Sequence, residues 1–271
     1  MKRLASIAAF LFPVPLLAEV RQEGLWGLPP CVTVGGHQID RLLVAVFWIV
    51  LAAFVLVQGT LVWFLYRYRR QPGVAPSRAK GSWRAEVLWT AIPAAVFLGL
   101  FAVGEGMWTR MIVPPPPGEA IDIEVCGEQY DWVVRYPGAD GVLGRADDAK
   151  RGPDNKLGLD PADPYGADDL IAFNELVVPV GKPVHLHLRS LDVIHGFYAP
   201  EFRLHQDLLP GRTINWVSFT AERTGEFSIA CSQLCGAGHG LMQGRFRVVT
   251  PEAWEAWLRD LAKNHAGGGK S

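Results

Sequence analysis

The pattern of hydrophobic positions changes near residue 110. Leu42–Tyr66 is a run of 25 consecutive uncharged, mostly apolar residues. At about 1.5 Å of rise per residue, a helix of this length spans the roughly 30 Å hydrocarbon core of a membrane. A second apolar run, Val87–Gly104, follows after a polar segment. We therefore predict two transmembrane helices, at about residues 42–66 and 87–108, in preference to two buried helices of a soluble protein.

The C-terminal half consists of short β-type runs separated by Gly, Pro and Asp. This spacing is typical of an all-β sandwich or barrel. Residues 137–169 are rich in Asp, Gly and Pro, and we predict that they form a surface loop inserted between strands. Residues 251–263 carry apolar side chains at helical spacing, which predicts a short amphipathic helix at the end of the domain. The predicted strands are Ile121–Val125, Trp132–Tyr136, Glu175–Val180, Pro183–Ser190, Thr213–Thr220, Glu226–Ala230 and Gly244–Val249.

The N-terminus has the pattern of a secretory signal peptide. Met1–Arg3 is positively charged, a short apolar run follows, and Ala18 is a small residue suited to cleavage. An uncleaved segment at the membrane surface is the alternative. The predicted divisions are a signal peptide at 1–18, an N-terminal segment with the helical hairpin at 19–110, an outer domain at 111–262 and a disordered tail at 263–271.

The charge of the loop between the two helices predicts the orientation of the protein. Short loops that are rich in Lys and Arg stay in the cytoplasm. Both ends of the hairpin and the β domain would then lie outside, on the periplasmic side of a bacterial-type inner membrane that the chain crosses twice. The basic residues of this loop are Arg67, Arg69, Arg70, Arg78, Lys80 and Arg84.

The net charge of -1 conceals a strong asymmetry. Residues 111–262 hold 22 acidic and 13 basic side chains, a net charge of about -9. An acidic outer domain would attract a basic protein partner electrostatically. The same domain has no long basic stretch with interleaved aromatic residues, and we do not expect it to bind nucleic acid.

Metal-binding residue types are concentrated between residues 231 and 242. Cys231, Cys235, His239 and Met242 lie within this short glycine-rich segment, and His195 lies upstream. Thiolate, thioether and imidazole ligands form a soft donor set that suits copper.

The number of ligands distinguishes among the possible metal sites. A blue-copper site needs two His, one Cys and a weak Met, so this set has one thiolate too many. A structural zinc site of two Cys and two His has no use for Met242. Two thiolates that bridge two copper ions, with one imidazole on each ion and weak axial ligands, use every residue of the set. A disulfide between Cys231 and Cys235 is a further alternative.

The chain resembles subunit II of the haem–copper oxidases over about residues 40–258. The motifs that carry the resemblance are Glu86–Pro93, Val193–His195, Gln206–Arg212 and Cys231–Met242. The resemblance implies two transmembrane helices followed by an all-β, cupredoxin-like Greek-key domain with a centre of two copper ions. Family members that oxidise quinol lack the copper ligands, so their presence here favours the branch that oxidises cytochrome c. The implied ligands are the side chains of His195, Cys231, Cys235, His239 and Met242, and the main-chain carbonyl of Gln233.

Three positions invite comparison with the family. Gln233 stands where the family usually has a glutamate that helps to bind magnesium at the interface with subunit I. An amide is a weaker magnesium ligand than a carboxylate, so we expect this binding to be weakened. Tyr130 occupies the place of an aromatic residue through which electrons enter, and strand packing is its alternative role. Glu86 matches a glutamate that feeds protons into subunit I, and a favourable helix-dipole contact is its alternative role.

The resemblance implies an electron-transfer subunit of a proton-translocating respiratory oxidase. Electrons would pass from cytochrome c through copper to haem in subunit I, where oxygen is reduced to water. The expected partners are subunit I, further membrane subunits and membrane lipid. A copper subunit of a nitric oxide reductase and a membrane-tethered copper-binding protein are the alternatives.

Cys31 and Cys126 allow a disulfide in an oxidising compartment, and we interpret His185 and His187 as structural or surface groups.

Overall fold

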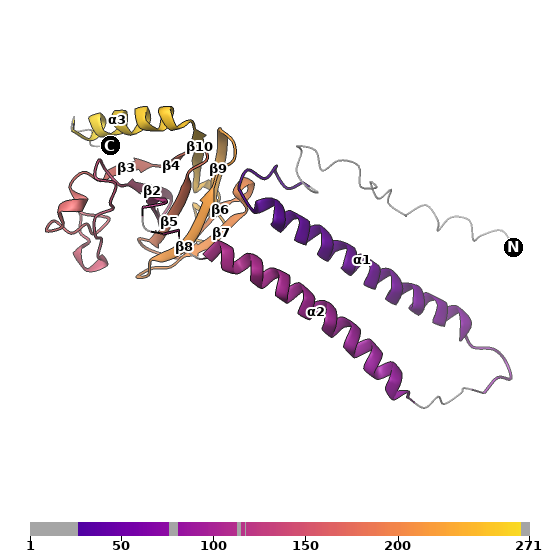
Figure 1. The fold of residues 1–271 in the computed structure, drawn as a ribbon. Helices are drawn as coiled ribbons and strands as arrows, with labels where there is room; N and C mark the ends of the chain where they lie inside the picture. Colours follow the sequence, from indigo (N-terminus) through magenta and orange to yellow (C-terminus); the bar gives the residue numbers. More distant parts are fainter. Residues whose placement is uncertain (1–26, 76–80, 113–114, 117, 267–271) are drawn as a thin grey trace, which may run out of the picture.

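The computed structural model describes residues 27–75, 81–112, 115–116 and 118–266. The predicted signal peptide and the end of the predicted tail lie outside these ranges. The helices α1 (Gly36–Arg67) and α2 (Trp83–Ile112) are long and apolar enough to cross a membrane. Both are longer than the apolar runs that predicted them, because polar turns extend each helix beyond a hydrocarbon core of about 30 Å. Figure 1 shows α1 and α2 both extending away from the β domain in the same general direction.

The outer domain contains two five-stranded sheets. The first has the strand order β3-β2-β1-β5-β8 and the second the order β4-β10-β9-β6-β7. Each sheet contains one parallel pair, β1 with β5 and β4 with β10, among antiparallel neighbours. The strands are β1 (Ile121–Glu128), β2 (Asp131–Tyr136), β3 (Leu170–Phe173), β4 (Glu175–Pro179), β5 (Pro183–Ser190), β6 (His195–Ala199), β7 (Leu204–Leu208), β8 (Ile214–Thr220), β9 (Gly225–Cys231) and β10 (Gln243–Val249). The shorter helices are η1 (Asp148–Lys150), η2 (Pro164–Gly166), η3 (Pro200–Phe202), η4 (His239–Leu241) and α3 (Pro251–Ala266).

The predicted fold class is confirmed: two apolar helices precede an all-β sandwich. The predicted set of strands lacks β3, β6 and β7. β3 has only 4 residues, and β6 and β7 carry glycine and polar side chains where an alternating pattern would place apolar ones. These two strands are defined instead by their hydrogen-bonded neighbours. β6 pairs with β7, and it also pairs with β9, where Phe197 lies opposite Cys231.

The core lies between the two sheets and combines aliphatic side chains with a group of packed aromatic rings. Trp132, Phe197 and Phe246 are fully buried, and the rings of Phe202 and Phe246 stack with their centroids 3.9 Å apart. Buried aromatic pairs of this kind each contribute roughly 0.5–1.5 kcal/mol beyond their buried area. The sulfur-bearing residues at 231, 235 and 242 belong to the same buried cluster. These three sulfur-bearing candidates are therefore part of the packed core.

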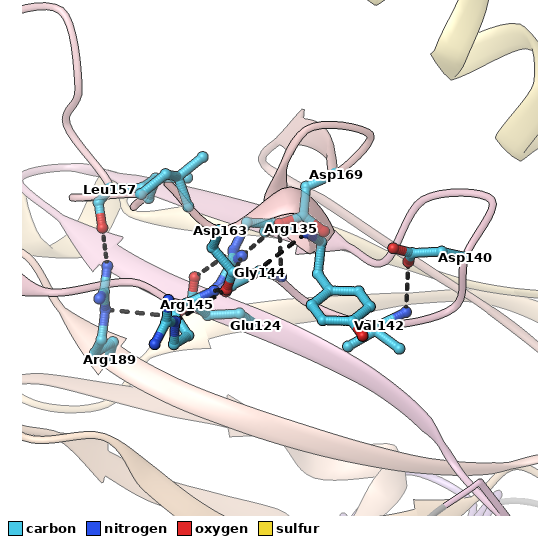
Figure 2. Close-up of polar contacts among 12 residues, drawn as sticks. Glu124, Arg135, Asp140, Val142, Gly144, Arg145, Leu157, Asp163, Asp169 and Arg189 are labelled. Carbon is cyan, nitrogen blue, oxygen red and sulfur yellow. Dashed lines mark hydrogen bonds and ion pairs between the residues drawn. The ribbon is translucent and has the colours of Figure 1, made fainter. Parts of the chain in front are cut away.

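A buried polar network anchors the inserted loop to the outer face of the first sheet. Arg135 donates hydrogen bonds to Glu124 at 2.8 Å and to the carbonyl of Gly144 at 2.8 Å, and it also pairs with Asp169. Arg189 reaches the loop through the carbonyl of Leu157. Figure 2 shows these groups converging between β1, β2 and the loop. Because the arginines are buried and paired with carboxylates, the loop packs on the sheet as part of the domain.

The helix α3 continues to Ala266, so residues 263–266 are helical, contrary to the predicted disordered tail. The indole rings of Trp254 and Trp257 pack against Tyr136 on β2. Near the end of the helix, the ring Nε2 of His265 lies 2.9 Å from the amide nitrogen of Ile171 on β3. This contact holds the last turn of the helix to the sheet. It could not be predicted from the pattern of apolar residues, because it is a polar contact.

The β domain is also joined to the start of the hairpin. The guanidinium of Arg203 donates to the carboxylate of Asp40 in α1 at 2.8 Å and to the carbonyl of Pro29 at 2.9 Å. Thr33 pairs with Ala221 as an isolated β-bridge. These contacts orient the outer domain relative to the membrane helices.

Candidate metal centre

The segment that carries most of the predicted ligands is the loop between β9 and β10. It packs on the ring of Tyr130, which lies at the turn between β1 and β2. Gly236 has a φ of 141°, and a Cβ at this position would lie 2.6 Å from the hydroxyl oxygen of Tyr130. Glycine is therefore required for the loop to fold this closely onto the sandwich.

The structure brings two thiols and two imidazoles together. The Sγ atoms of Cys231 and Cys235 lie 3.8 Å apart. Nδ1 of His195 lies 3.9 Å from Sγ of Cys231, and Nδ1 of His239 lies 3.6 Å from Sγ of Cys235. Each thiol thus has its own imidazole. A disulfide requires a sulfur–sulfur distance near 2.05 Å, so these two cysteines are not bonded to each other.

Two weaker donors complete the cluster. The carbonyl oxygen of Gln233 lies 3.1 Å from Sγ of Cys231, and Sδ of Met242 lies 3.9 Å from Sγ of Cys235. The six residues predicted from the sequence therefore converge on one point. A donor set of two thiols, two imidazoles, a thioether and a carbonyl fits copper, which favours soft sulfur and nitrogen ligands.

Asp192 orients the upstream histidine, a role that sequence reasoning missed. Its Oδ1 lies 2.7 Å from Nε2 of His195, so Nδ1 of the ring is directed at the thiols. The carboxylate also accepts hydrogen bonds from the amides of Gln129 and Val193. Burial raises the pKa of Asp192, but these hydrogen bonds outweigh it and hold the pKa below its usual value. Carboxylates that orient metal-bound histidines in this way recur in metalloproteins, and the spacing of Asp192 three residues before His195 was the available signal.

Four of the six candidate ligand residues are shielded from solvent. His195 and Met242 are fully buried, and both cysteines are buried. Burial, together with the hydrogen bond to Cys231, raises the pKa of Cys235 to about 11. Because a metal binds the thiolate, loading the centre at neutral pH must release this proton.

The other predicted residues lie apart from the cluster or beside it. Tyr130 is partly buried beneath the ligand loop, where it both packs and lies close to the centre. Glu86 is in the first turn of α2, at the end of the hairpin far from the β domain (Figure 1). Cys31 and Cys126 are both free thiols, so the disulfide that the sequence allowed is not formed. Cys126 points from β1 into a small separate cluster of buried residues.

Comparison with known proteins gives consistent matches over both parts of the chain. The family described as cytochrome c oxidase subunit II, periplasmic domain, matches residues 121–249, and the transmembrane domain of the same subunit matches residues 23–103. The alternative cytochrome c oxidase subunit 2 of Bradyrhizobium diazoefficiens is 35% identical over 89% of this chain and 86% of its own length. Cytochrome c oxidase subunit 2 of Thermostichus vulcanus is 32% identical over 77% of this chain and 70% of its own length. Among solved structures, the periplasmic domain of subunit II of a Bradyrhizobium japonicum cytochrome oxidase is 31% identical, with a TM-score of 0.41, over 55% of this chain and 97% of that domain.

Proposed function

The chain belongs to the cytochrome c oxidase subunit II family, and we propose that it carries electrons from a cytochrome c to subunit I through a centre of two copper ions. The family makes it a membrane-bound subunit of an oxidoreductase complex, with the β domain outside the membrane. Reduction of oxygen to water then takes place at haem in subunit I, and the present chain supplies the entry point for electrons.

One observation carries the proposal of two metal ions rather than one. The two thiols are adjacent, each has its own imidazole, and each has one weak donor, the carbonyl of Gln233 or the thioether of Met242. Cys231 and Cys235 would therefore hold two ions together, and each thiol would bring one imidazole and one weak donor. When bound, such a pair of copper ions would supply a one-electron couple that is shared between both metals.

The residues around the site suit electron transfer. Attachment to β6, β9 and β10 holds the ligands in place, and Asp192 fixes the ring of His195. Little movement is then needed when the charge of the centre changes. Leu234 and Leu241 in the ligand loop are 80% and 84% exposed, and such apolar groups beside a buried centre suit docking of a protein partner. The acidic outer domain would steer a basic cytochrome towards the complex.

A kinetic experiment tests the proposed function. The complex is purified with its large subunit, and reduced cytochrome c is mixed with it while haem reduction is followed. Cys231→Ser should remove the rapid phase, whereas Cys31→Ser, a matched change at a cysteine outside the centre, should leave it intact. Equal rates in the two variants would mean that electrons bypass this centre. Reduction of nitric oxide in place of oxygen by the same complex would favour the nitric oxide reductase alternative.

We also propose that the protein resides in a bacterial-type inner membrane with its interhelical loop in the cytoplasm. The basic residues around that loop support this orientation. Single cysteines introduced as Ala75→Cys and Lys150→Cys, in a background without the native cysteines, can be labelled in intact cells. Position 150 should react with an impermeant reagent and position 75 should not. The reverse pattern would overturn the proposed topology.

A further inference from the structure

A second cluster of metal-ligand types lies on the outer face of the first sheet. His185 and His187 are separated by one residue on β5, so their side chains leave the same face of the strand. The neighbouring strand β1 runs parallel, and its register places Asp122 opposite His185. One ligand atom from each of these three residues lies within 4.8 Å of the other two.

The contacts within this cluster hold the side chains in place. Nε2 of His187 lies 2.7 Å from Oδ1 of Asp122. Nδ1 of His185 lies 2.8 Å from Oγ of Ser218, which is opposite it on β8. The two imidazole rings meet edge to face with their centroids 4.7 Å apart. Three strands thus contribute to one arrangement, in which Ser218 fixes the orientation of a histidine as outer hydrogen-bond partners do in metal sites.

The protonation states of His185 and Asp122 also suit metal binding. Burial, with the adjacent ring of His187 adding to it, lowers the pKa of His185, so this imidazole is neutral at pH 7. The hydrogen bond with His187 lowers the pKa of Asp122, which is therefore a carboxylate. Neutral imidazole and carboxylate are the forms that bind metal. The side chains of His187 and Asp122 are 27% and 42% exposed, so an ion can reach them from solvent.

Nearby charges do not compete for these ligands. Glu124 lies on the same face of β1, but its carboxylate pairs with Arg135 at 2.8 Å and with Arg189 at 3.4 Å. Among the described residues of this face, Asp122 is therefore the carboxylate that lies beside the two histidines without an arginine partner. The cluster contains no sulfur, in contrast to the centre in the β9–β10 loop.

We propose that Asp122, His185 and His187 form a second metal site, which binds a divalent ion of the zinc type through two imidazoles and one carboxylate. Three protein ligands leave one coordination position of a tetrahedral ion for water or an external ligand. The site is separate from the proposed copper centre and does not depend on it.

Zinc titration of the full-length chain in detergent tests the proposal. The centre between Cys231 and Cys235 is first loaded with copper, and weakly bound metal is removed with a chelator, so that the thiols are not available to zinc. Calorimetry should then show a single zinc ion bound per chain. Cobalt in place of zinc should give weak visible bands without the strong thiolate absorption that binding at cysteine would produce.

Variants separate this site from other surface histidines. His187→Gln and Asp122→Asn should each weaken zinc binding at least about tenfold, and Ser218→Ala should weaken it about tenfold through the orientation of His185. His205→Gln changes an exposed histidine elsewhere and should have no effect. Thermal unfolding provides a second readout, since zinc should raise the melting temperature of the parent and of His205→Gln but not of His187→Gln. No zinc binding by the parent, or equal binding by the parent and His187→Gln, would overturn the proposal.

Discussion

The outer domain holds two groups of metal-ligand residues that are built in different ways. In the β9–β10 loop, the candidate ligands come from one short segment together with His195, and four of them are buried: His195, Cys231, Cys235 and Met242. On the face of the first sheet, Asp122, His185 and His187 are brought together by the register of neighbouring strands; His187 and Asp122 are partly exposed, whereas His185 is buried. The first group offers sulfur and the second only nitrogen and oxygen. One sandwich thus carries a mostly buried cluster of soft donors and a partly exposed cluster of harder donors.

The strongest test of whether the two groups bind metal independently is to remove one of them and measure metal binding at both. Cys235→Ser should abolish the binuclear copper signal, because each thiolate is expected to bridge both ions, while zinc binding at the sheet stays unchanged. His187→Gln should weaken zinc binding at the sheet and leave the binuclear copper signal unchanged. Copper spectra and zinc calorimetry on the two variants provide the measurement. Loss of zinc binding in Cys235→Ser would mean that zinc binds the thiols, and the two sites would then not be independent.

The next largest expected effect is a loss of stability in the first sheet, which carries the proposed second site. Arg135→Met removes the partner of the buried Glu124 and Asp169 and should lower the free energy of unfolding by about 3–5 kcal/mol. Arg145→Met is the matched control. Its side chain is 74% exposed, although its partner Asp163 is buried, so its loss should cost less than the loss of the buried Arg135. Urea unfolding in detergent, followed by near-ultraviolet circular dichroism, measures the difference. Equal midpoints for the two variants would show that the buried network does not hold the sheet together.

How much of the fold and of the two groups of metal-ligand residues could be predicted depends on how far apart in the sequence the contacting residues lie. The candidate copper ligands from Cys231 to Met242 are recognisable because they lie within one loop and belong to rare residue types. The hairpin is equally visible, because a lipid-facing helix must be apolar for its whole length. The strands β6 and β7 escape prediction, since Gly196 and the polar side chains of β7 break the alternation and pairing alone defines them.

The sheet cluster could not be recognised for a related reason. His185 and His187 are visible as a pair on one strand, but Asp122 lies more than sixty positions earlier. Only the parallel register of β1 and β5 brings it alongside. The orienting role of Asp192 likewise depends on the path of the chain before β6.

A smaller effect is expected at Gln233, whose side chain is exposed while its carbonyl faces Cys231. Gln233→Glu should strengthen binding of manganese, a magnetic probe for magnesium, to the assembled oxidase, because a carboxylate is the better ligand. The copper spectrum should scarcely change, since the carbonyl is retained. Manganese binding as tight in the parent as in the variant would show that other groups hold this ion. A strong shift of the copper spectrum would contradict the main-chain role of this residue.

The smallest expected effect is the pH dependence contributed by His185. Its pKa in the folded protein is lowered from 6.5 by burial and by the ring of His187, with the carboxylate of Asp122 opposing the shift. The unfolded chain therefore binds a proton more readily, so this contribution is present above about pH 6.5 and declines as the pH falls below it. In metal-free protein, His185→Gln should flatten the fall in melting temperature between pH 7 and pH 5. An unchanged slope would mean that the ring titrates normally in the fold.

The most direct test of the central claim is the paramagnetic resonance spectrum of the oxidised, copper-loaded full-length chain. The two adjacent thiols, each with its own imidazole, predict the hyperfine pattern of one unpaired electron shared equally by two copper nuclei. The same preparation should contain two copper ions per chain at this centre. A hyperfine pattern from a single copper nucleus would contradict the account, because Cys231 and Cys235 would then not bridge a pair of ions.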